Sequence, residues 1–67
     1  MKYDLVGIDG NAFSLMGYVV KAMKECGFSN DEQNDYLAKA TSGNYDNLLC
    51  VSMEIIDKCN EIVGGIE

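Results

Sequence analysis

Apolar and polar residues follow one another along this chain in a pattern that predicts one strand and three helices. A run with β-favouring bulk at Tyr3, Leu5 and Val6 stops at a turn. Behind it, apolar residues recur at the spacing of an α-helix in three further segments. The expected elements are a strand over residues 2–8 and helices over residues 12–26, 30–41 and 45–63. The fold class is therefore mainly α, a small helical bundle in a single domain, residues 1–67.

Capping residues stand at the expected helix ends. Asn11 and Asn44 are good N-caps, because a side-chain oxygen there accepts a hydrogen bond from a backbone amide of the first turn. Ser29 followed by Glu32 three residues later matches the capping box that opens many helices. Gly27 is a natural left-handed stop for the helix before it.

Two of the predicted helices have unusually wide apolar faces. On a helical wheel the apolar residues of 12–26 and of 45–63 each cover an arc of roughly 200°, more than a surface helix needs. The helix over 30–41 is mostly polar, and we expect it to lie outside on the other two. A surplus of apolar surface marks an interface, and a lone strand needs a partner. We therefore expect a homo-oligomer, most simply a two-fold dimer, to complete the bundle.

The net charge of the chain makes some classes of binding partner unfavourable. Eleven acidic residues against five lysines give a net charge of −6. Such a surface repels phosphate backbones and anionic lipids, so nucleic acids and membranes are disfavoured as partners. No apolar run approaches the ~18 residues of a membrane span, and the start shows no signal-peptide pattern. We expect a cytoplasmic protein with reduced thiols.

The sequence offers little for catalysis. The chain has no histidine, the commonest general base at neutral pH, and Cys26, Cys50 and Cys59 have no partner of that kind. An EF-hand beginning at Asp9-x-Asn11 fails, because the glycine and the final glutamate of that loop are missing. We therefore expect no enzyme activity, no metal and no cofactor.

Two places are candidates for binding. Asp9, Gly10 and Asn11 precede a helix whose first amides attract anions, although a turn with an N-cap explains the same residues better. Tyr45 and Asp46 open the last helix. Tyrosine is enriched at interfaces, so Tyr45 serves either as a binding anchor or as core packing of the first turn, and neither interpretation is favoured.

Two segments give the chain a resemblance to known proteins. Asp9-Gly10-Asn11-Ala12-Phe13 and Ser42-Gly43-Asn44-Tyr45-Asp46-Asn47-Leu48-Leu49 resemble motifs of short proteins encoded by bacteriophages and prophages, over about Leu5 to Met53. Asn44 and Asn47 stand where that group has an aspartate and a histidine. No activity is established for the group, so the resemblance implies only a bacterial cytoplasm and a phage or prophage gene.

These expectations lead to two hypotheses about function. In the first, the chain is a non-catalytic binding protein that engages or inhibits a host or phage protein through an oligomeric acidic and apolar surface. In the second, it binds or sequesters a small, nucleotide-type ligand at the Asp9-Gly10-Asn11 helix start or at a subunit interface.

Overall fold

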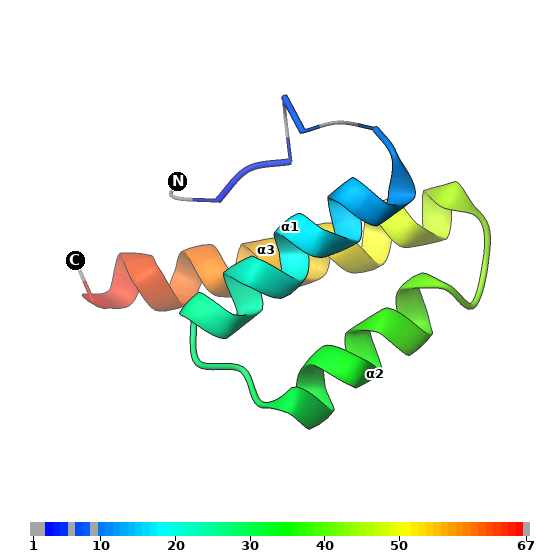
Figure 1. Cartoon of the computed structure of the whole chain (residues 1–67). Coiled ribbons are helices and arrows are strands. Elements are labelled where there is room, and N and C mark those ends of the chain that lie inside the picture. Colours follow the sequence, from blue (N-terminus) through cyan, green and yellow to red (C-terminus); the bar gives the residue numbers. More distant parts are fainter. Residues whose placement is uncertain (1–2, 6, 9, 67) are drawn as a thin grey trace.

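The computed structural model describes residues 3–5, 7, 8 and 10–66, and the fold is mainly helical, as expected (Figure 1). The helices are α1 (Ala12–Glu25), α2 (Asn30–Ala40) and α3 (Tyr45–Ile66). The first two end one residue before the predicted ranges do. The third continues to Ile66, three residues past the end of the predicted range at 63.

The helices begin where side chains satisfy their first backbone amides. Asn11 Oδ1 accepts hydrogen bonds from the amides of Phe13 (2.9 Å) and Ser14 (3.4 Å), which caps α1. Asn44 Oδ1 accepts from the amide of Asn47 at 3.0 Å and caps α3 in the same way. The start of α2 has the complete capping box, with Ser29 and its partner three residues on exchanging two hydrogen bonds.

Gly27 ends α1 in a Schellman motif. Its φ is +88°, a left-handed conformation that glycine adopts without steric cost. The amide of Phe28 donates to the carbonyl of Met23 at 2.9 Å, and the amide of Gly27 donates to the carbonyl of Lys24 at 3.2 Å. The chain therefore turns sharply and enters α2.

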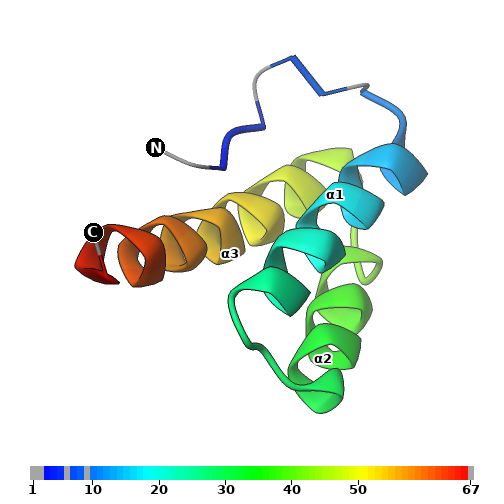
Figure 2. The same ribbon diagram turned by 60° about the vertical axis from the view of Figure 1, so that its left-hand side comes forward.

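α1 and α3 lie side by side and run in the same direction, while α2 connects them and packs against α3 (Figures 1 and 2). Contacts at both ends fix this parallel arrangement. At the start of α3, the hydroxyl of Tyr45 contacts the carbonyl of Gly10, which lies just before α1. Further along α3, the carbonyl of Cys59 contacts the thiol of Cys26, which lies just after α1. The buried apolar core lies between these elements and comprises Tyr3, Leu15, Val19, Ala22, Met23, Tyr36, Ala40, Leu48, Ile56 and Cys59.

The polar helix α2 is attached to the bundle by a short inner face. Gln33, Tyr36 and Ala40 are buried, whereas Ala38 is exposed. Gln33 is tolerated inside because its Nε2 donates to the carbonyl of Phe28 at 3.1 Å. The Tyr36 hydroxyl shares a 2.6 Å hydrogen bond with Ser52 of α3, so both buried hydroxyls are satisfied.

The predicted strand over residues 2–8 is wrong for the part of it that the structure describes. Residues 3–5, 7 and 8 form no strand, and the amide of Ile8 instead donates to the carbonyl of Leu5 in a turn. The physical reason is that side chains take the place of a strand partner. The carboxamide of Asn60 bonds both backbone groups of Tyr3, with Tyr3 N to Oδ1 at 2.9 Å and Nδ2 to Tyr3 O at 3.0 Å.

Three different elements cover the wide apolar face of α3. Ser52 contacts α2, Cys59 contacts the end of α1 and Asn60 contacts the N-terminal segment. Much of the surplus expected from the sequence is therefore buried within one chain, and the homo-oligomer stays a prediction. None of the described helices has the length and apolar character needed to cross a membrane.

Candidate functional site

The structure brings together the candidate residues at the starts of α1 and α3. The Tyr45 hydroxyl donates to the carbonyl of Gly10 at 2.6 Å, and Asn11 follows directly as the cap of α1. Tyr45 is 43% exposed, so it is neither a core residue nor a fully open anchor. Asp46 is exposed beside it. Asp9 lies outside the described residues.

This end of the bundle is built for capping more than for holding an anion. The amides of Phe13 and Ser14 already donate to the cap, so they are not available to a ligand. A shallow groove of about 280 Å³ lies next to Tyr45. It is lined by Ala12, Met16, Ala40, Thr41, Gly43, Asn44, Tyr45 and Leu48, which include no charged side chain. A nucleotide phosphate would find no cation there.

A second groove lies between α3 and the N-terminal segment, residues 3–5, 7 and 8. This groove, which we call the α3 groove, has a volume of about 310 Å³. It is lined by Tyr3, Asp4, Leu5, Leu49, Met53, Ile56, Asp57 and Asn60. Met53 is 56% exposed, although most large apolar side chains of this chain are covered. The groove is therefore an apolar surface open to solvent.

Charge beside the α3 groove is of one sign. Its lining contains two aspartates and no lysine. On the helical wheel, Asp46 and Asp57 both lie within about 40° of Met53, and both are exposed. The single lysine of α3, Lys58, lies instead on the side that faces α2. A basic partner would meet complementary charge along this edge.

Side-chain hydrogen bonds hold the N-terminal wall of the α3 groove in place. The Tyr3 hydroxyl donates to Glu25 Oε1 at 2.9 Å, and the amide of Asp4 donates to the hydroxyl of Tyr18 at 2.9 Å. Burial, and then the hydrogen bond to Glu25, raise the pKa of Tyr3, so its hydroxyl stays protonated as a donor. Together with Asn60, these contacts tie the segment to both α1 and α3.

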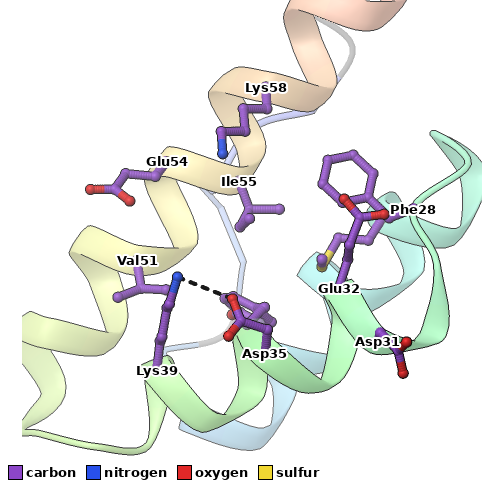
Figure 3. Close-up of a pocket in the computed structure, with 11 residues that line it drawn as sticks. Phe28, Asp31, Glu32, Asp35, Lys39, Val51, Glu54, Ile55 and Lys58 are labelled. Atoms are coloured by element: carbon purple, nitrogen blue, oxygen red, sulfur yellow. Dashed lines mark ion pairs between the residues drawn. The ribbon is translucent and has the colours of Figure 1, made fainter.

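A third groove, about 300 Å³, separates α2 from α3 (Figure 3). Met23, Phe28 and Tyr36 are among its apolar lining residues. Its charged residues are of both signs: Asp31, Glu32, Asp35, Lys39, Glu54 and Lys58.

These charges interact within α2 and, more weakly, across the third groove. Lys39 Nζ lies 3.0 Å from Asp35 Oδ2 (Figure 3). The hydrogen bond from the Ser29 amide, with a smaller contribution from Lys58, lowers the pKa of Glu32. The rim has four carboxylates and two lysines, so its charge is only partly compensated and remains acidic.

Among the described residues, no three cysteine or carboxylate side chains are grouped so that they could hold a metal ion. Cys50 is exposed, whereas Cys26 and Cys59 meet at the end of α1.

Sequence reasoning did not find the α3 groove. Leu5 was assigned to a strand, and Met53 was counted within the wide apolar arc of residues 45–63 without being singled out. The position of Met53 at the edge of that arc, next to Asp46 and Asp57, is the signal that could have marked it. Comparison with models of protein families, with curated proteins and with solved structures gives no match to this chain.

Proposed function

We propose that this chain is a non-catalytic binding protein whose α3 groove receives an amphipathic helix of a partner protein, with lysine or arginine beside its apolar face. The observation that carries the proposal is Met53, more than half exposed in an apolar groove and bordered by Asp57. An exposed apolar surface rimmed by polar groups is typical of an interaction site.

The dimensions of the groove suit a helix. Its α3 wall extends from Leu49 to Asn60, twelve residues that span about 16 Å of helix, which corresponds to about three turns. Leu49, Met53 and Ile56 follow one another at spacings of four and three residues, so they form one ridge against which the apolar stripe of a second helix can pack. Covering Met53 would contribute up to about 1.5–3 kcal/mol.

The acidic edge gives the partner its expected charge. A net charge of −6 and the aspartates of the groove would speed the approach of a basic helix and disfavour an acidic one. The resemblance to phage and prophage proteins supports a host or phage protein as the source of that helix. A second copy of this chain is the competing occupant, and the oligomeric state tests it.

The test uses immobilised protein and lysate of a bacterial host, with four forms of the chain. Wild type is compared with Met53→Glu, which places a charge in the groove, and with Met53→Leu, which keeps it apolar. Phe13→Ser is the matched control, because Phe13 is 82% exposed but does not line the groove. A partner identified by mass spectrometry is then purified, and its affinity for each form is measured.

We expect wild type, Met53→Leu and Phe13→Ser to retain one shared partner, and Met53→Glu to bind it at least tenfold more weakly. Asp57→Lys should also weaken binding, and the loss of affinity should be larger at low salt than at high salt. The proposal is contradicted if Met53→Glu captures and binds the same proteins as wild type. Light scattering that shows a dimer in wild type and a monomer in Met53→Glu would assign the groove to a second copy instead.

A further inference from the structure

Two of the three cysteines of this chain are in contact inside the fold, and their thiols are near enough to interact. Cys26 Sγ lies 3.9 Å from the backbone carbonyl oxygen of Cys59, where it is placed as a hydrogen-bond donor. The two residues are 33 positions apart in the sequence and belong to different elements, the cap that ends α1 and the middle of α3. Cys50 is separate from them and exposed.

The surroundings distinguish the two members of the pair. Cys26 is partly exposed, so a small oxidant can reach it, whereas Cys59 is fully buried. The Schellman turn at Gly27 fixes the backbone next to Cys26, and the helix fixes Cys59. The Tyr3 hydroxyl also lies close enough to the Cys26 thiol to hydrogen-bond with it. One accessible thiol therefore faces one protected thiol across a rigid junction.

We infer that Cys26 and Cys59 form an oxidation site, at which a peroxide converts the two thiols to an intramolecular disulfide that joins the end of α1 to α3. In the first step Cys26 sulfur attacks one peroxide oxygen, the O–O bond breaks, and Cys26 becomes a sulfenic acid while water leaves. In the second step Cys59 sulfur attacks Cys26 sulfur, the S–O bond breaks, and a second water leaves with the Cys59 proton. Two thiols are oxidised and one hydrogen peroxide is reduced.

The acidity of the buried thiol sets the speed of this reaction. Burial, and then the neighbouring Cys26 thiol, raise the pKa of Cys59 to about 12. Because the thiolate is the attacking species, little of it exists at neutral pH, and the second step is slow there. The second step should therefore become faster as the pH rises toward the pKa of Cys59.

The site lies next to the α3 groove. Tyr3 lines the groove and its hydroxyl also contacts the Cys26 thiol and Glu25. A disulfide removes the thiol proton at this junction and prevents α1 and α3 from separating beneath the wall of the groove. The oxidation site itself does not depend on the groove being a binding surface, since it follows from the two thiols alone.

The test treats the full chain with hydrogen peroxide and compares wild type with Cys26→Ala, Cys59→Ala and Cys50→Ala. In wild type and Cys50→Ala we expect a monomer that has lost two hydrogen atoms, and a peptide that links residues 26 and 59. Its thermal midpoint should be higher than that of the reduced protein, and dithiothreitol should reverse both changes. Cys26→Ala and Cys59→Ala should form no such species.

Circular dichroism of the reduced variants shows whether each one is folded before oxidation. If Cys59→Ala fails to fold, wild type and Cys50→Ala still decide the matter, because both keep the pair. The inference is overturned if folded wild type accumulates only dimers linked through Cys50, or only sulfinic acid at Cys26, while Cys59 remains a free thiol.

Discussion

Replacing Asn60 by alanine should release the N-terminal segment from α3. The carboxamide of Asn60 makes two hydrogen bonds to Tyr3, at 2.9 and 3.0 Å, and Tyr3 is 6% exposed. A hydrogen bond of this kind contributes about 0.5–1.5 kcal/mol net, so losing both should cost about 1–3 kcal/mol. The whole chain is expected to have a free energy of unfolding of only about 3–10 kcal/mol. The loss is therefore a sizeable fraction of the total.

Asn60→Asp keeps one of the two hydrogen bonds and removes the other. The aspartate keeps an oxygen that accepts from the Tyr3 amide, but it cannot donate to the Tyr3 carbonyl when ionised. A carboxylate oxygen would instead face that carbonyl oxygen, and the two repel each other. At neutral pH we expect Asn60→Asp to be destabilised at least as much as Asn60→Ala.

Urea unfolding followed by far-ultraviolet circular dichroism measures both effects. Glu61→Ala is the matched control, because Glu61 is the next residue of α3 and is exposed, and its replacement should change stability by less than about 0.5 kcal/mol. Since the segment forms one wall of the α3 groove, Asn60→Ala should also weaken binding of any partner. If both Asn60 variants unfold at the same urea concentration as Glu61→Ala, the contact with Tyr3 does not hold the segment, and our explanation for the missing strand fails.

Three further predictions concern the helices. Gly27→Ala should destabilise the chain by about 1 kcal/mol, because the φ of Gly27 is +88°. Gly17 lies in the open interior of α1, so Gly17→Ala should stabilise the chain by about 0.5–1 kcal/mol. Urea unfolding in which the two variants change the free energy of unfolding in the same direction would contradict this. Tyr36→Phe and Ser52→Ala should each cost about 1–3 kcal/mol by leaving a buried hydroxyl unpaired, while the double variant should cost clearly less than their sum, and simple additivity would argue against the 2.6 Å hydrogen bond. The pKa of Glu32 is lowered in the folded chain, so its contribution to stability is present above the unfolded carboxyl pKa and is lost as the pH falls through the folded pKa. Glu32→Gln should therefore reduce the dependence of stability on pH in the acidic range. An unchanged pH–stability curve would count against the capping box.

The helix boundaries could be predicted because their causes are local. Asn11, Asn44 and the Ser29 capping box satisfy amides at most three residues away, and Gly27 needs only its own backbone conformation. Each of these signals is contained in a few consecutive residues, so α1, α2 and α3 begin at the residues where the sequence predicts them. The end of α3 has no comparable signal, and there the prediction stopped too early.

The N-terminal segment and the α3 groove could not be predicted, because their causes are distant in the sequence. Tyr3 and Asn60 are 57 positions apart, and no local pattern indicates that a carboxamide will take the place of a strand. Phe13 shows the same limit, since it belongs to the wide apolar face predicted for residues 12–26, and the pattern alone did not indicate that it would be 82% exposed. Of the candidate residues, Tyr45 and Gly10 proved to be neighbours, which two separate motifs could not reveal.

The parallel course of α1 and α3 gives the molecule a permanent electrical axis. Peptide dipoles of neighbouring antiparallel helices cancel, but those of two parallel helices add, with the positive pole at the capped starts. Toward the opposite pole α3 has Glu54, Asp57 and Glu61 against the single Lys58, and its last turn contains no basic residue. Near a positively charged target the molecule would therefore rotate before contact, so that the later turns of α3 face the target. Added salt would screen the field and weaken this preferred orientation.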